Sequence, residues 1–259
     1  MELESRTTTT TTTTNRTATK RETIETEIVV TDKRGYQNAF ILSQVVGLAL
    51  LVIILVWIFN HLNGLAFNKP SYLFNFHPLL LVVSIILSSN GLLIFRTLRN
   101  RNKYRLKQLH ALLNGCVIVL GGLGSAAAIV YHHQANIAHF YSLHSWLGIA
   151  TWILYLSQFI IGFYSFLAPG ASYKTRSFLL PFHRYIGAAT FALAIATSLC
   201  GLNEKAIFSL PNYSQLPAAG ILINVSALLL ILYASLVVYC VTKPEFKRFP
   251  ISKDLKNKN

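Results

Sequence analysis

Residues 141–146, YSLHSW, open a long apolar segment and place one imidazole, that of His144, near its start. A titratable ring in such a segment is costly unless it has a partner, so it indicates a functional site. Three other apolar segments also carry a histidine near their start: His77, His110 and His183. Four histidines on four segments suggest two bis-histidine haem sites with an electron path between them.

The composition favours a membrane protein. Of the 259 residues, 53% are hydrophobic and 12% are charged, whereas a soluble domain is typically about 25% charged. No Asp or Glu occurs between Asp32 and Glu204, so five successive apolar segments carry no carboxylate. This argues against a carboxylate-lined metal site and against paired carboxylates for acid–base chemistry. The three cysteines have no CxxC spacing and are interpreted as small apolar residues.

Six apolar segments are each close to the roughly 20 residues that a helix needs to cross a bilayer. The predicted spans are 39–60, 76–95, 109–131, 142–167, 179–201 and 217–241. Short connections predict antiparallel neighbours in one bundle. The predicted fold class is therefore an all-α membrane protein with six transmembrane helices, whose central four-helix bundle holds two haems.

The two ends of the chain are polar. Residues 1–38 include eight consecutive threonines and are predicted to form a disordered cytoplasmic tail. The six-span membrane domain then covers 39–242, and 243–259 form a basic cytoplasmic tail.

Lysines and arginines predict the orientation. With both termini on one side, that side receives 21 of the 23 basic residues, and the other receives only Lys69 and Lys205. Because cytoplasmic loops carry an excess of Lys and Arg, both termini are predicted to be cytoplasmic in this multi-pass protein. The net charge of +14 mostly reflects this topology. The predicted partner of the basic residues is the lipid bilayer with its anionic headgroups, and nucleic acid is not a predicted partner. A glycosylation sequon at 212–214 would lie on the opposite side.

The four histidines sort into pairs by depth. His77 and His144 start spans on the non-cytoplasmic side, and His110 and His183 start spans on the cytoplasmic side. Neutral imidazole is a good ligand for haem iron, and facing helices of a bundle can each supply one ring. Small residues recur on the same helix faces as the histidines: Ser84, Ser88 and Gly91; Gly121 and Gly124; Thr190, Ala194 and Thr197. They either admit a flat macrocycle or pack membrane helices together.

From about Phe74 to Leu202 the sequence resembles the cytochrome b561 family of ascorbate-dependent transmembrane electron carriers. The resemblance depends on FNFHPLL at 74–80, YSLHSWLG at 141–148 and LPFH at 180–183. The histidine spacings of 33, 34 and 39 also agree. It implies a six-helix fold, two haem b groups, commonly a homodimer, and His77, His144, His110 and His183 as the iron ligands.

The resemblance also implies substrate-binding residues. On the cytoplasmic side these are Lys103, Lys107, Arg176 and Arg96, and on the other side His132 and Tyr141. Basic groups suit ascorbate, which is a monoanion at neutral pH. The same basic residues also fit a purely topological role. His139 stands where many family members have Asn, and the loop histidines 132, 133 and 139 fit a metal, a substrate or solvent.

The predicted function is therefore electron transfer from cytoplasmic ascorbate, through the two haems, to monodehydroascorbate or a ferric chelate on the other side. No catalytic side chain is predicted, because the haems carry the redox chemistry. One alternative is a transporter or channel whose histidines line a polar pathway. Others are a reductase driven by a nicotinamide–flavin domain and a non-catalytic receptor. Plasma, endosomal or lysosomal, and secretory-vesicle membranes all fit the sequence.

Overall fold

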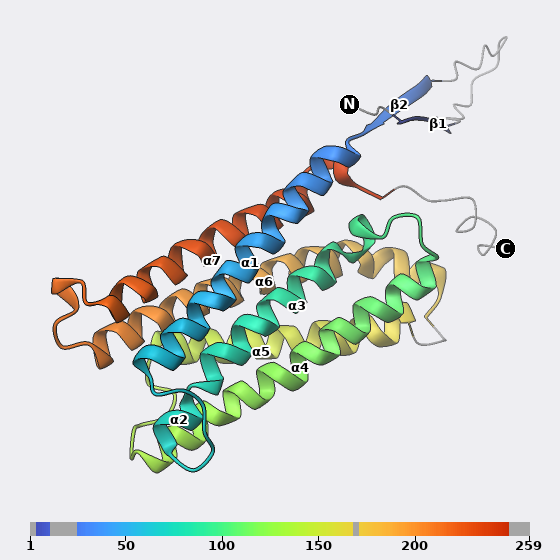
Figure 1. Ribbon diagram of the computed structural model, residues 1–259. Helices are drawn as coiled ribbons and strands as arrows, with labels where there is room; N and C mark the ends of the chain where they lie inside the picture. Colours follow the sequence, from blue (N-terminus) through green and yellow to red (C-terminus); the bar gives the residue numbers. More distant parts are fainter. Residues whose placement is uncertain (1–3, 11–24, 168–170, 249–259) are drawn as a thin grey trace, which may run out of the picture.

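The computed structural model describes residues 4–10, 25–167 and 171–248, and six long helices lie side by side in it (Figure 1). The long helices are α1 (Lys33–His61), α3 (Phe76–Thr97), α4 (Lys103–Gln134), α5 (Leu143–Gly162), α6 (Tyr173–Ser209) and α7 (Ala218–Thr242). The short ones are α2 (Pro70–Phe74), the π-helix η1 (Phe163–Leu167), and the 3-10 helices η2 (Tyr213–Gln215) and η3 (Pro244–Phe246). All six long helices are apolar enough to cross a membrane, so the predicted six-span fold is confirmed.

Several helices extend beyond the predicted spans because polar residues cap them. The carboxylate of Asp32 accepts a hydrogen bond from the N–H of Gly35 at 2.7 Å and starts α1 six residues before the predicted span. Ser172 caps α6 in the same way, so this helix begins at Tyr173 and runs on through Pro181. Asn102 caps α4 by accepting from the N–H of Tyr104, so His110 on α4, like His183 on α6, lies inside its helix rather than at the first turn.

The N-terminal tail contains two paired strands. Strand β1 (Glu4–Thr10) runs antiparallel to β2 (Glu25–Thr31), with Glu4 opposite Thr31. The composition of this tail predicts disorder, but its threonine, isoleucine and valine residues are β-branched and favour strands. The rest of the predicted N-terminal tail up to residue 24, and the predicted basic tail from 249, lie outside the described residues.

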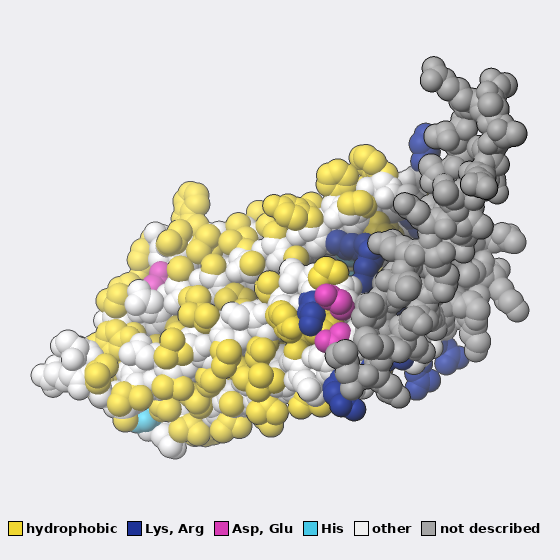
Figure 2. Space-filling view, turned by 90° about the horizontal axis from the view of Figure 1, so that it is seen from above, with side chains coloured by type: hydrophobic (Ala, Val, Ile, Leu, Met, Phe, Trp, Pro, Cys, Tyr) yellow, Lys and Arg dark blue, Asp and Glu magenta, His cyan; other side chains and the backbone are white. Residues whose placement is uncertain are grey.

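The beginning of α1 and the end of α7 lie at the same end of the bundle (Figure 1). The N–H of Asp32 donates to the carbonyl of Glu245, and the ammonium of Lys243 lies 3.3 Å from the Asp32 carboxylate. Hydrophobic side chains cover most of the face in Figure 2, whereas Lys and Arg gather towards the end from which both termini emerge. We call this the terminal end and the other the far end.

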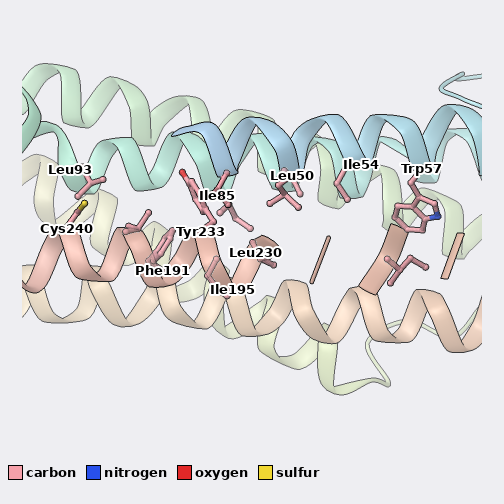
Figure 3. Packing of buried hydrophobic residues seen from close by; sticks show 14 of the residues in the cluster. Leu50, Ile54, Trp57, Ile85, Leu93, Phe191, Ile195, Leu230, Tyr233 and Cys240 are labelled. Carbon is pink, nitrogen blue, oxygen red and sulfur yellow. The ribbon is translucent and has the colours of Figure 1, made fainter. Parts of the chain in front are cut away.

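The buried core joins α1 and α7 to α3 and α6. Figure 3 shows Leu50 of α1 facing Leu230 of α7, with Tyr233 of α7 beside Ile85 of α3. The Tyr233 hydroxyl is hydrogen-bonded to the Ser89 hydroxyl of α3, and its ring lies against Gly47 of α1, where a Cβ would come within 2.9 Å. The outer pair of helices is thus fixed to the four that carry the histidines.

The four histidine-bearing helices form two closely packed antiparallel pairs, α3 with α4 and α5 with α6. Glycines bring α3 and α4 together, because a Cβ at Gly91 would lie 2.8 Å from Nδ2 of Asn114, and one at Gly124 would lie 2.6 Å from Cδ2 of Leu81. These glycines therefore take the packing role that small residues have between membrane helices.

Candidate functional site

One histidine pair lies at the far end. His77 and His144 are the second residues of α3 and α5, and their ring centroids are 6.0 Å apart with the planes at 85°. Nδ1 of His77 lies 3.1 Å from the carbonyl oxygen of Gly124, and Nδ1 of His144 lies 2.9 Å from that of Thr197. Because a carbonyl oxygen only accepts, each Nδ1 carries the hydrogen, and each Nε2 keeps its lone pair for a metal.

The other pair lies towards the terminal end. His110 of α4 and His183 of α6 have ring centroids 6.2 Å apart, with the planes at 72°. Nδ1 of His110 lies 2.8 Å from the carbonyl oxygen of Gly91, whereas the buried Nδ1 of His183 has no hydrogen-bond partner among the residues that the structure describes. The rings of Phe95 and Phe166 lie beside His110 and His183 at 5.9 and 5.2 Å.

The separation of the two rings in each pair would suit a metal ion bound between them. Two metal–nitrogen bonds of about 2 Å, plus about 1 Å from each nitrogen to its ring centre, require centroids about 6 Å apart. The measured separations of 6.0 and 6.2 Å meet this requirement. A histidine ligand normally donates its other N–H to a carbonyl, which fixes its tautomer, and three of the four rings do so.

The two pairs lie at different depths along the bundle. Gly124, which accepts from His77, comes fourteen residues after His110 on α4. At about 1.5 Å per residue, the two levels are roughly 21 Å apart along the helix axis. This is inside the limit of about 30 Å set by the thickness of the bilayer core.

Aromatic and amide side chains lie between the two levels. The hydroxyl of Tyr155 donates to Oδ1 of Asn114 at 2.5 Å, and Nδ2 of Asn114 donates to the carbonyl of His110 at 2.6 Å. Trp152 lies 6.5 Å from Tyr155 and donates to the hydroxyl of Ser125. This group was not predicted from the sequence. Its signal is that Tyr155 stands eleven residues after His144, where the other three helices carry a small residue at the same distance from their histidine.

Three of the predicted cytoplasmic ligands lie together at the terminal end. The ammonium of Lys107 donates to the carbonyl of Phe166 at 2.8 Å, and the charges of Lys103 and Arg176 act on it. Lys103 and Arg176 are exposed. Since the Phe166 ring lies against His183, this basic cluster of Lys103, Lys107 and Arg176 is adjacent to the second histidine pair.

The fourth predicted cytoplasmic ligand, Arg96, is placed differently. Its guanidinium donates to the carbonyl of Lys243 at 2.9 Å and to that of Val241, both at the end of α7. It therefore caps α7, satisfying carbonyls that the helix itself leaves unpaired. Its predicted role in ligand binding stays a prediction.

The predicted far-end ligands lie in and next to the loop between α4 and α5. The rings of His132 and His139 are 5.9 Å apart, and Nδ1 of His132 lies 3.3 Å from the carbonyl of Ala138. Tyr141 is exposed. Lys205, predicted only as a topology signal, has its ammonium 4.7 Å from the centroid of the Phe74 ring, which neighbours His77 at 5.8 Å.

Six membrane-spanning helices around two histidine pairs define a helical membrane protein that can hold metal cofactors in its core. Comparison with known proteins specifies the family. Eukaryotic cytochrome b561 proteins match residues 76–209. The transmembrane ascorbate-dependent reductase CYB561 of Homo sapiens is 40% identical over 215 residues, covering 82% of this chain and 84% of that protein. The protein of that name from Sus scrofa is 38% identical with the same coverage.

A second named relative is similar over nearly the same length. The plasma membrane ascorbate-dependent reductase CYBRD1 of Mus musculus is 33% identical over 220 residues, which cover 83% of this chain and 76% of that protein. The chain therefore belongs to the cytochrome b561 family, as its motifs predicted. Membership of this family implies binding of b-type haem.

Proposed function

We propose that this protein is an ascorbate-dependent transmembrane reductase that holds two b-type haems, one at each histidine pair. The observation that carries the proposal is the matched geometry of the pairs, with ring centroids 6.0 and 6.2 Å apart. The names of the relatives, ascorbate-dependent reductases, support the same reaction. Bound at these positions, haem supplies one-electron transfer at each end of the bundle.

The residues of the chain do the rest. His77 with His144, and His110 with His183, would hold the haem irons, and the carbonyls of Gly124, Gly91 and Thr197 fix three of the rings. The apolar helices exclude water from the space between the two levels. Lys103, Lys107 and Arg176 attract the ascorbate monoanion to the terminal end, next to Phe166 and His183.

The terminal end is the cytoplasmic one in this proposal, since Lys and Arg gather there. The electron acceptor then meets the far end, where His132 and Tyr141 bind monodehydroascorbate or a ferric chelate. A homodimer is supported by α5, on which none of the described residues is buried within the single chain.

An absorption spectrum of the purified protein tests this function. We expect about two haems per chain. Addition of ascorbate should increase the α-band absorbance that is typical of reduced haem. His144→Ala should remove the far-end haem and His183→Ala the other. A protein without a Soret band, purified from haem-replete cells, would refute the proposal and favour a transporter with a polar pathway.

A further inference from the structure

Three of the four histidines are held by one repeated arrangement. The Nδ1 acceptors are Gly124 for His77, Gly91 for His110 and Thr197 for His144. Each acceptor lies on the partner helix, not on the helix of the histidine that it binds. On that partner helix it comes fourteen residues after the partner helix's own histidine, as Gly124 comes after His110. Fourteen residues are close to four helical turns, so acceptor and histidine share one face. The arrangement therefore places a defined residue opposite each imidazole.

For His183 the corresponding residue is Gln158, fourteen residues after His144 on α5. Glycines support this placement. A Cβ at Gly201, four residues after Thr197, would lie 2.7 Å from Cε1 of His144, and a Cβ at Gly162, four residues after Gln158, would lie 2.8 Å from Cε1 of His183. The His183 ring therefore lies against α5 in the same way as the His144 ring lies against α6. By this correspondence Gln158 stands opposite Nδ1 of His183, where Thr197 stands opposite Nδ1 of His144.

Within the described parts of the chain, two buried polar atoms at this level have no hydrogen-bond partner. They are Nδ1 of His183, a donor when Nε2 binds a metal, and Oε1 of Gln158, an acceptor. Leaving such atoms unpaired in an apolar bundle is costly, and pairing them with each other removes both costs.

Two features set Gln158 apart from the other three positions. It is the only one of the four acceptor-level residues with a carboxamide side chain, the others being Gly91, Gly124 and Thr197. In addition, α5 ends at Gly162 and continues as the π-helix Phe163–Leu167, so the regular backbone stops one turn beyond Gln158. π-helical turns of this kind are frequent at functional sites.

We propose that Oε1 of Gln158 accepts the Nδ1–H hydrogen bond of His183, so that a side chain here does what main-chain carbonyls do for the other three histidines. Gln158 is then a positioning residue, because it acts through His183 and does not touch the iron. This inference depends on the proposed function, in which His183 ligates a haem.

The bond has a measurable consequence. A hydrogen bond accepted from the second ring nitrogen makes the imidazole a more basic ligand and fixes its orientation. A more basic ligand stabilises ferric iron and lowers the reduction potential of the haem it binds. Because the acceptor is a side chain, a substitution can remove it, which is not possible for the three main-chain carbonyls.

The test is a redox titration of the purified holoprotein, followed by absorbance and by the EPR signals of the two low-spin haems. Gln158→Leu removes the acceptor, Gln158→Met removes it while keeping the length of the side chain, and Gln158→Glu keeps an oxygen in place. Ser157→Ala controls for a neighbouring change on α5.

We expect the leucine and methionine variants to raise the potential of the His110–His183 haem alone and to shift its EPR signal. The glutamate variant should keep that potential at or below the wild-type value, and the Ser157→Ala control should leave both potentials unchanged. The inference is overturned if the leucine and methionine variants leave the potential unchanged, if both haems shift together, or if the glutamate variant matches the leucine variant. Wild-type protein that binds no haem would instead refute the proposed function.

Discussion

Replacing Gly201 by alanine should displace His144 and weaken the far-end haem site. The added Cβ would lie 2.7 Å from Cε1, 2.9 Å from Nδ1 and 3.3 Å from Nε2 of the His144 ring. The new methyl group would therefore press on the whole edge of the imidazole that carries these three atoms. Ordinary contact begins at 3.4 Å, so the ring must move by about 0.7 Å. Functional geometry tolerates only about 0.5 Å of displacement.

The ring cannot move by this amount without loss. Its Nδ1 is held 2.9 Å from the Thr197 carbonyl, and overpacking of a well-packed site typically costs about 1–3 kcal/mol. Loss of such a partner of a metal ligand typically lowers affinity by about 10–100-fold. We therefore expect Gly201→Ala to bring the haem content from near two towards one per chain, with the His110–His183 haem retained.

The assay is haem content per protein together with the absorption spectrum of each haem. Gly122→Ala is the control, because an added Cβ there meets no atom within 4 Å. If Gly201→Ala kept two haems with an unchanged spectrum, the contact between His144 and α6 would not position the ring, and the reasoning would fail.

Three further outcomes are expected. Arg96→Ala should lower the melting temperature, because the protein loses two charge-assisted hydrogen bonds to the end of α7, each worth about 1.5–3 kcal/mol. An effect confined to the KM for ascorbate would instead favour a role of Arg96 in ligand binding. Lys107→Ala should raise the KM for ascorbate several-fold in steady-state reduction assays while both haems stay bound, whereas an unchanged KM would contradict a role in substrate binding. The N–H of Gly35 and the ammonium of Lys243 hold the pKa of Asp32 below its ordinary 3.8, so its stabilising effect is present above that pH and lost as the pH falls through the lowered pKa. Asp32→Asn keeps the helix cap and should flatten this part of the melting-temperature profile; an unchanged profile would show that the carboxylate has no such effect.

The membrane spans and the family could be predicted from the sequence because both depend on strong local patterns. Long apolar runs define the helices, and the motifs around His77, His144 and His183 are specific. The helix ends were less predictable. Asp32 and Ser172 extend α1 and α6 through caps, which weigh little in a hydropathy pattern.

The surroundings of the histidines were beyond sequence reasoning. The acceptors at Gly91 and Gly124 are main-chain carbonyls, which every residue has, so no residue type reveals them. Arg96 shows the opposite difficulty. Its charge suits an anion, but its guanidinium binds carbonyls at the end of α7, more than a hundred residues further along the chain. Only the packing of α3 against α7 reveals these partners.

The exchange of hydrogen bonds between α3 and α4 has a mechanical consequence. His77 of α3 bonds to α4 at one end, and His110 of α4 bonds to α3 at the other. A slip of one helix along the other by a single residue, about 1.5 Å, would stretch both bonds together. The register of α3 against α4 therefore sets the position of one histidine of each pair, so a shift of either helix at one membrane face would also displace a histidine near the opposite face.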